Sequence, residues 1–320
     1  MKRVILVSVA LLLLVWAPGL SRVTFSDQLE SLFKAIDTGD APQVKHLLDK
    51  GAPVEAVSSA DGATPLIRAA KRGRLHIVKL LLDRGAGVNT RDAQFEATPI
   101  YWACLYNHIE VAKLLLTKSP DVNAGDRTGA TPLMAAASKG FREIVSLLLA
   151  RGAKINASDK EGNTALRKAV ERGHANVVQV LLNEGADADT LNLDGTSLLM
   201  TAAKAGHRHV LEILLERGSR SLNTEDRSGA TALIWAILAG DPRTAQLLLA
   251  KGANANHKEK DGWTALHYAS AKGDMEMVRL LLEHGADVNS VNIYRETPLA
   301  KASKRGHKEI ANVLATQGGR

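Results

Sequence analysis

A block of about 33 residues recurs along this chain from near residue 28 to the C-terminus, and this repeat constrains the fold more than any other feature. One marker of the repeat is a Thr-Pro-Leu triplet or a close variant of it. A fixed period of this length is typical of stacked helical units, none of which can bury its apolar face alone. The sequence therefore predicts an elongated all-α array. The eight copies of the triplet begin at Thr64, Thr98, Thr131, Thr164, Ser197, Thr231, Thr264 and Thr297, at steps of 33 or 34 residues.

The unit that begins at Asp261-Gly262 shows how one block is expected to fold. Asp-Gly favours a turn, and Thr264 is placed to cap a first helix. After a Gly turn, residues 275–284 carry apolar side chains at helical spacing and predict a second helix. Gly285 is expected to end that helix, because a left-handed residue without a Cβ is favoured there.

The pattern of these units resembles the ankyrin repeat, whose signature is D-G-x-T-P-L-H, a helix of small residues, G-H, an I/V-V-x-x-L-L helix and G-A-x-V-N. The resemblance covers about residues 28–320 as eight full units and a divergent opening unit. It implies an all-α ankyrin-repeat solenoid of about nine helix–turn–helix units with short β-hairpin tips. It also implies that partners are recognised by the hairpin tips and by the first helices, which line a concave face.

Changes in composition divide the chain into five segments. Residues 1–21 are distinct from the array, and residues 22–27 are expected to form a short linker. Residues 28–60 lack the Thr-Pro-Leu triplet, and residues 296–320 replace the usual Leu run with smaller and polar residues. We expect these two segments to cap the array of residues 61–295, because terminal units face water on one side.

Residues 1–21 have the outline of a secretory signal peptide: a basic start, an apolar run from Val4 to Ala17 and a segment of small residues. Cleavage is expected after Gly19, with Ser21 as the alternative. The array is then secreted or periplasmic, as in the bacterial type of signal peptide, and no stable membrane insertion is expected after cleavage. The competing hypothesis is an uncleaved anchor in the inner membrane, although the run is shorter than the roughly 20 residues of a spanning helix.

The sequence contains no catalytic constellation that stands out from the repeat. It has no phosphate-binding loop, no Gly-x-Ser-x-Gly motif and no Cys-x-x-Cys pair. Most histidines occupy repeat positions, and the resemblance explains them as structural residues that open the second helix. Cys104 stands at a small-residue position and is expected to be a buried apolar residue. We therefore expect a protein that is not an enzyme and that binds no metal or cofactor.

The repeat register places three residues of each first helix on the concave face. Across eight units this set holds eleven basic residues and one acid, whereas the whole chain has a formal net charge of +7. We therefore expect this groove to bind an acidic segment of another protein. The alternative is that these side chains are ordinary solvated residues. The basic candidates are Arg68, Lys71, Arg72, Lys139, Arg172, Lys272, Lys304 and Arg305.

Four aromatic residues in the same set are candidate anchors for a partner, since aromatic side chains are enriched at the centres of interfaces. Trp102 and Tyr106 lie four residues apart and share one face of a helix. Trp235 and Tyr268 hold the same position in successive units and are expected to be neighbours. The alternative is that these rings pack between units.

The hairpin tips offer a second candidate surface. Leu191, Leu193, Ile293 and Tyr294 are apolar residues at tips that are otherwise charged, and exposed apolar clusters indicate contact surfaces. Phe95 lies in a tip with one extra residue and is expected to fold back onto the array.

These features predict an exported binding module, expected to be a monomer, that holds another protein non-covalently. Two alternatives stay open: an inhibitor or immunity-type protein that occludes an enzyme, and an envelope scaffold or protective factor that contacts anionic polymers. Nucleic acid is not an expected native ligand, because the predicted export signal would take the chain away from it.

Overall fold

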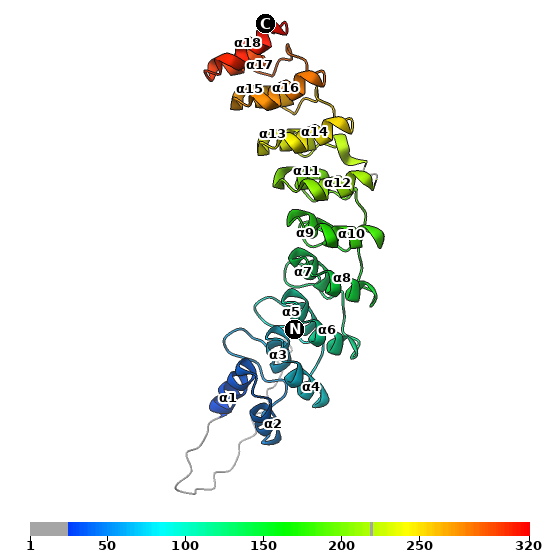
Figure 1. The fold of residues 1–320 in the computed structure, drawn as a ribbon. Coiled ribbons are helices and arrows are strands. Elements are labelled where there is room, and N and C mark those ends of the chain that lie inside the picture. The colour runs from blue at the N-terminus through cyan, green and yellow to red at the C-terminus, as the bar shows by residue number, and fades with distance from the viewer. Residues whose placement is uncertain (1–24, 218–219) are drawn as a thin grey trace, which may run out of the picture.

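The structure is a computed structural model that describes residues 25–217 and 220–320, in which eighteen α-helices form nine consecutive pairs (Figure 1). The expected signal peptide at residues 1–21 lies outside the described residues. The pairs follow one another in a single elongated stack. The first helices are α1 (Phe25–Thr38), α3 (Pro65–Lys71), α5 (Pro99–Leu105), α7 (Pro132–Lys139), α9 (Ala165–Glu171), α11 (Leu198–Ala205), α13 (Ala232–Ala239), α15 (Ala265–Lys272) and α17 (Pro298–Lys304).

The second helices alternate with the first along the chain. They are α2 (Ala41–Asp49), α4 (Leu75–Asp83), α6 (Ile109–Leu116), α8 (Arg142–Leu149), α10 (Ala175–Asn183), α12 (Arg208–Glu216), α14 (Pro242–Ala250), α16 (Met275–Glu283) and α18 (Lys308–Thr316). A 3-10 turn, η1, spans Ser221–Asn223. Helix α1 begins at Phe25, so residues 25–27 are its first turn and not part of the expected linker. Asp27 suits that turn, because a carboxylate is stabilised at the positive end of a helix.

The first helices from α3 onward begin where the Thr-Pro-Leu triplets predict. In α7 the backbone N–H of Met134 donates to the hydroxyl of Thr131 at 3.3 Å. Pro132 suits the first helical position, because the backbone N–H that it lacks would have no partner within the helix. Gly140 ends the helix with φ of +76°, a conformation that disfavours any residue with a Cβ. The sequence therefore sets both ends of this short helix locally.

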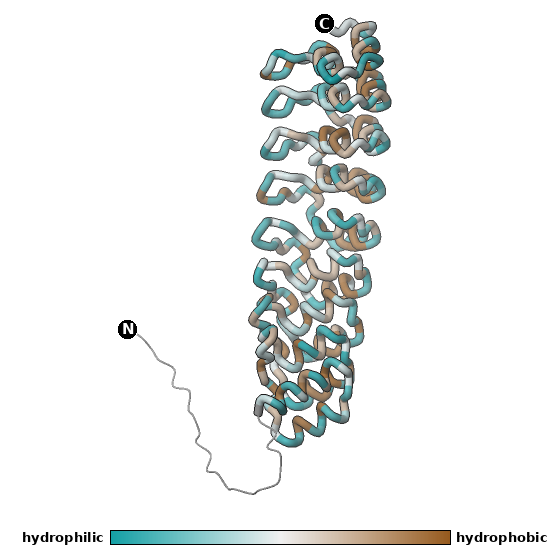
Figure 2. The backbone as a smooth tube through the Cα atoms, turned by 90° about the vertical axis from the view of Figure 1, so that its left-hand side faces the viewer, coloured by the Kyte–Doolittle hydropathy of each residue, from teal (hydrophilic) through white to brown (hydrophobic). Residues whose placement is uncertain are grey.

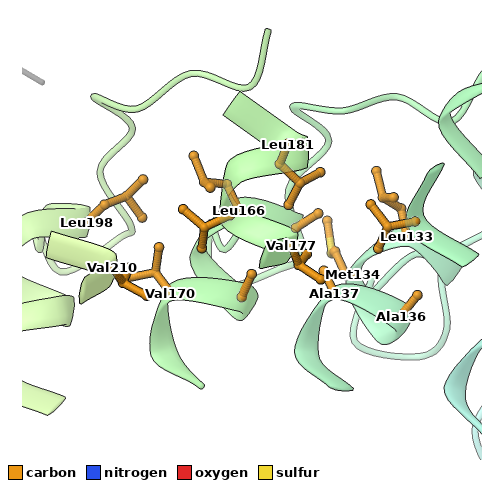
Figure 3. Close-up of a cluster of buried hydrophobic side chains, with 14 of the residues drawn as sticks. Leu133, Met134, Ala136, Ala137, Leu166, Val170, Val177, Leu181, Leu198 and Val210 are labelled. Atoms are coloured by element: carbon orange, nitrogen blue, oxygen red, sulfur yellow. The ribbon is translucent and has the colours of Figure 1, made fainter. Parts of the chain in front are cut away.

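One continuous apolar core runs through the stack. Leu133, Leu166 and Leu198 from successive first helices lie beside Val177 and Leu181 of α10, and all five are buried (Figure 3). Each buried Leu or Val contributes roughly 1.5–3 kcal/mol relative to exposure. Since these contacts join adjacent pairs, a single helix pair could not shield its apolar face from water.

Polar contacts also join adjacent pairs. His174 donates from Nε2 to the carbonyl of Ser138 in the preceding pair at 3.1 Å, which fixes the ring tautomer because a carbonyl only accepts. Asn123 accepts the backbone N–H of Lys154, 31 residues further on, at 2.8 Å. The Asn that ends the G-A-x-V-N signature thus binds the next unit.

Hairpin loops precede the first helices and project from one side of the helix stack (Figure 2). Neighbouring hairpins are linked, since Arg127 N donates to Phe95 O at 2.7 Å and Lys160 N donates to Thr128 O at 2.9 Å. Over the described ranges there is no β-strand, and β-pairing is limited to one antiparallel bridge between Ser158 and Thr164. The expected hairpins are therefore tight turns, too short for a ladder.

Candidate partner-binding surface

We call the surface formed by the last part of each first helix and the hairpins beside it the groove. Its aromatic residues do not all present their rings to solvent. Trp102 is only 5% exposed and packs with Tyr101 of its own unit and with Ile67 and Ala135 of the two adjacent units. This favours packing between units for Trp102, and the ring itself offers little surface to a partner.

Trp102 is held from several sides. Its Nε1 donates to Asp92 Oδ2 at 2.8 Å, and the Nζ of Lys71 lies 4.1 Å from its ring centroid. Tyr106 stacks on it with centroids 5.9 Å apart, and Phe95 meets its face edge-on at 5.5 Å. Tyr106 is 48% exposed, so a partner can reach this side chain of the cluster.

Phe95 is 42% exposed although its ring contacts Trp102. The expected return of this side chain onto the array is therefore seen, with one edge left in water. Glu96 holds the hairpin position that is Gly in most other units, and it adopts the same left-handed conformation there, with φ of +56°. This conformation is uncommon outside Gly and Asn.

Trp235 repeats much of this arrangement four units later. Its Nε1 donates to Asp226 Oδ2 at 2.9 Å, and the Nζ of Lys204 lies 4.5 Å from its ring centroid. The ring is half-buried, and Leu238, three residues further along α13, is 37% exposed. This end of α13 therefore leaves apolar surface open.

Tyr268 is not paired with Trp235 as its register predicts. Its ring instead lies 4.8 Å from that of Trp263, which the sequence analysis did not single out. Burial and a hydrogen bond to the carboxylate of Glu259 raise the pKa of Tyr268. Lys301 covers Trp263, with its Nζ 4.4 Å from the ring centroid. Trp263, a hairpin residue, thus contacts Tyr268 where Trp235 of the preceding first helix was expected to do so.

Several candidate cations are neutralised inside the protein. Arg68 bonds Asp37 and Asp61 at 3.0 Å each, and Arg72 bonds Asp37 at 2.8 Å. These carboxylates come from α1 and from a hairpin, so they were not among the three concave positions counted in each of the eight units that carry the triplet. The N-terminal part of the groove is consequently less positive than the sequence register predicts.

The C-terminal part of the groove is also partly neutralised. Lys304 bonds Glu296 Oε1 at 3.2 Å, and Lys301 bonds the other oxygen of the same carboxylate. These lysines hold the pKa of Glu296 down at about 2. Lys272 donates to the carbonyls of Ile237 and Leu238 at the end of α13, at 3.2 and 2.8 Å.

Within the described residues, three candidate cations keep exposed side chains that form neither an ion pair nor a side-chain hydrogen bond: Lys139, Arg172 and Arg305. Lys139 and Arg172 hold the same position in consecutive units, and Tyr106 holds it in the unit before them. Helices α5, α7 and α9 therefore present one exposed aromatic ring and two exposed cations in a row. The single acid of the set, Glu171, lies beside Arg172 and is also exposed.

The four candidate tip residues are exposed. Leu191 and Leu193 are 46% and 61% exposed, and Ile293 and Tyr294 are 60% and 64% exposed. The two pairs lie in hairpins three units apart, so they form two separate apolar spots and not one patch.

Carboxylates of the hairpins bind groove residues, and the repeat register did not predict these contacts. In one hairpin Asp226 uses Oδ1 to accept the backbone N–H of Ala230 and Oδ2 to accept Trp235 Nε1. Asp159 similarly accepts Asn163 N and binds the Nζ of Lys168 at 3.0 Å. In the sequence, an acid nine residues before Trp235 or Lys168 indicates this contact.

A depression of about 590 Å³ lies at the N-terminal end between α1 and the first hairpin, where Phe33, Val57 and Arg68 contribute to its walls. Among the described residues, no group of acids, histidines and cysteines could hold a metal ion. Within the same ranges, no helix is long and apolar enough to cross a membrane. Cys104 is fully buried, and burial raises the pKa of its thiol.

Nine stacked helix pairs, projecting hairpins and a lined groove define a helical-repeat scaffold, a class that binds partners over an extended surface. A family model described as ankyrin repeats (3 copies) matches residues 32–126, 120–192, 168–259 and 238–319. The chain therefore belongs to the ankyrin-repeat family, whose members are typically non-enzymatic modules for protein–protein interaction. The resemblance noted from the motifs is thereby confirmed. A comparison with curated proteins found no significant match.

Proposed function

We propose that this ankyrin-repeat protein is an exported binding module that holds an acidic segment of another protein in its groove. The observation that carries the proposal is the row formed by Tyr106, Lys139 and Arg172. Their side chains occupy one repeat position in three consecutive units and are exposed, and neither cation has an acidic partner among the described residues. A carboxylate-rich segment would complement this row.

Because the stack is rigid, it can bind a partner tightly without burying a large interface area. The groove side chains project from short helices that are packed on both sides, so little backbone freedom remains to be lost on docking. Exposed charges act over roughly 8–10 Å at physiological ionic strength, so the attraction should weaken as salt rises. The same charges should accelerate encounter with an acidic partner.

Charge reversal in the row tests this proposal. The protein is titrated with a fluorescent peptide of alternating Glu and Ser residues, and the double variant Lys139→Glu/Arg172→Glu is compared with the native protein. We expect affinity to fall at least tenfold, since two attractive contacts become repulsive. The matched control is Lys79→Glu/Arg142→Glu, which makes the same charge change on second helices, away from the groove. Equal binding by both variants would refute the groove as the site.

The two other hypotheses predict different behaviour in the same assay. An anionic polymer should bind by charge alone, so affinity would depend on salt and on net charge but not on peptide sequence. An inhibitor of an enzyme would instead show saturable, one-to-one binding to a folded partner. We favour a protein segment, because Tyr106 adds an apolar contact beside the cations that a simple polyanion would not use.

We propose that residues 1–21 direct export and that cleavage follows Gly19 or Ser21. Support comes from the basic start and from the apolar run that ends at Ala17. Mass spectrometry of the protein purified from its host would test this. A mature chain that begins at Leu20 or Arg22 is the expected result, and an intact Met1 in the membrane fraction would favour the anchored alternative.

A further inference from the structure

Two units of the groove are built in the same way. Trp102 in α5 and Trp235 in α13 hold the same repeat position, and each donates from Nε1 to a hairpin carboxylate, Asp92 or Asp226, at 2.8 or 2.9 Å. An aspartate that bonds the indole nitrogen fixes the ring plane. Each tryptophan therefore forms a rigid floor at its place in the groove.

A lysine from the preceding unit covers each of these rings. Lys71 Nζ lies 4.1 Å from the Trp102 centroid, and Lys204 Nζ lies 4.5 Å from the Trp235 centroid. Both lysines stand 31 residues before their tryptophan. Neither has an ion-pair partner among the described residues, and the face of an aromatic ring does not neutralise an ammonium group. Each lysine is therefore placed to receive a carboxylate from a ligand.

Apolar surface stands beside each ring as well. A leucine follows each tryptophan by three residues: Leu105 is half-buried, and Leu238 is 37% exposed. Tyr106 extends the apolar surface of the first place, whereas Ala239 leaves the second more open. We name the two places the N-terminal subsite (Lys71, Trp102, Leu105, Tyr106) and the C-terminal subsite (Lys204, Trp235, Leu238, Ala239).

The groove between the subsites is basic. Lys139 of α7 and Arg172 of α9 are exposed there without an acidic partner in the described part of the chain. The two subsites lie four units apart, and helix layers are spaced by roughly 8–10 Å, so the separation is about 32–40 Å. An extended chain of about 10–12 residues covers that distance at roughly 3.3 Å per residue.

We infer that the groove takes one extended segment that carries an apolar side chain at each end of an acidic stretch of about 10–12 residues. Each apolar side chain seats against the leucine of one subsite, a neighbouring carboxylate meets the lysine above the ring, and the acidic stretch follows Lys139 and Arg172. This inference rests on the proposed function and adds the spacing and the chemistry of the ligand. Because the second contact becomes intramolecular after the first, a segment of matching length should bind far more tightly than either half.

Synthetic fluorescent peptides test the spacing directly. The two-anchor peptide has Leu at both ends of an alternating Glu-Ser stretch of about 11 residues. The one-anchor peptide replaces one Leu with Ser, and the short peptide keeps both Leu around a stretch of about four residues. We expect the two-anchor peptide to bind the protein at least tenfold more tightly than either of the others.

Groove variants locate the anchors. Leu238→Ser copies the residue that α7 carries at this position, Ser138, and Tyr106→Ala copies Ala205 and Ala239. Either change should bring the affinity of the two-anchor peptide down to that of the one-anchor peptide. Leu193→Ser is the control, because it removes a leucine that is more exposed than Leu238 but lies at a hairpin tip outside the groove. Circular dichroism and thermal melting establish that each variant is folded.

The outcomes separate this inference from the proposed function. If all acidic peptides of equal length bind equally and Lys139→Glu/Arg172→Glu weakens them all, the proposal that the basic groove binds acidic segments stands and the two-subsite inference fails. The inference also fails if folded Leu238→Ser keeps the full two-anchor advantage. If no acidic peptide binds the native protein, both proposals are overturned.

Discussion

At the scale of single residues, repeat positions that look alike differ in what surrounds them. Arg167 fills the place that His267 holds in a later unit, and both side chains bond the carbonyl that precedes the next helix cap. Arg167 is 1% exposed, and its partners are the neutral groups of Thr190, Thr196 and Thr201. Burial lowers the pKa of its guanidinium, and its Nε has no hydrogen-bond partner. The residue is thus a buried cation that forms no ion pair with any described residue, and the nearest acids, Glu171 and Asp159, act on its charge from a greater distance.

We expect Arg167→Met to leave the free energy of unfolding unchanged or to raise it by about 1–4 kcal/mol, because apolar replacement removes the cost of burying a charge. Met134 and Met200 occupy the same position in the neighbouring units. Arg167→Ala should instead lower it by about 2–5 kcal/mol through the cavity it leaves. Urea denaturation measures both. Equal destabilisation by Met and Ala would contradict this account.

Two glycines that share a repeat position should respond differently to Ala. Gly140 and Gly206 have φ of +76° and +70°, but a Cβ on Gly140 would lie 2.7 Å from His174 Nδ1, whereas a Cβ on Gly206 meets nothing within 4 Å. Both variants should lose about 1 kcal/mol to the left-handed conformation. Gly140→Ala should lose a further ~1–3 kcal/mol by overpacking. Thermal melting of the pair is the measurement, and equal losses would show that the histidine moves aside freely.

At the scale of elements, charged side chains tie hairpins to helices. Glu296 precedes α17 and binds Lys301 and Lys304 of that helix, which lowers its pKa from 4.5 to about 2. A depressed carboxyl pKa contributes stability above the unfolded-state value of 4.5, and this contribution is lost as the pH falls through the folded-state value near 2. The stability of the final unit should therefore depend on pH in part through this carboxylate.

The melting temperature of the native protein should fall as the pH drops from 4.5 towards 2, and Glu296→Gln should flatten part of this fall. At pH 7 the variant should melt lower than the native protein, and the difference should shrink on acidification. Calorimetry across this pH range is the test. A constant difference between the two proteins at every pH would exclude a role for the ionised carboxylate.

At the scale of the whole molecule, the nine pairs contact mainly their neighbours, so stability should be distributed along the stack (Figure 1). The hydrogen bonds that bridge units join successive ones, as in the contact of His174 with Ser138. Damage to one unit should therefore be felt next to it and fade with distance.

Leu148→Ala in α8 should cost about 2–5 kcal/mol locally, because the side chain is fully buried. Hydrogen–deuterium exchange should then accelerate in α7, α8 and the adjoining pairs, with α15 to α18 little changed. Leu281→Ala in α16 makes the same change near the other end and should give the mirrored pattern. Uniform acceleration across the stack after either change would indicate one cooperative unit.

The sequence by itself determined the array: the Thr caps, the Gly ends and the apolar spacing act within a few residues, so the pattern of each unit predicts its helices and the period predicts the stack. Only the tertiary structure decided which groove residues are open. Trp102 is covered by Lys71 and Tyr106, and Arg68 is neutralised by Asp37, which stands 31 residues away in another unit. The physical reason is that exposure and ion pairing depend on what the next layer places over a residue, and a register read along one chain cannot show that.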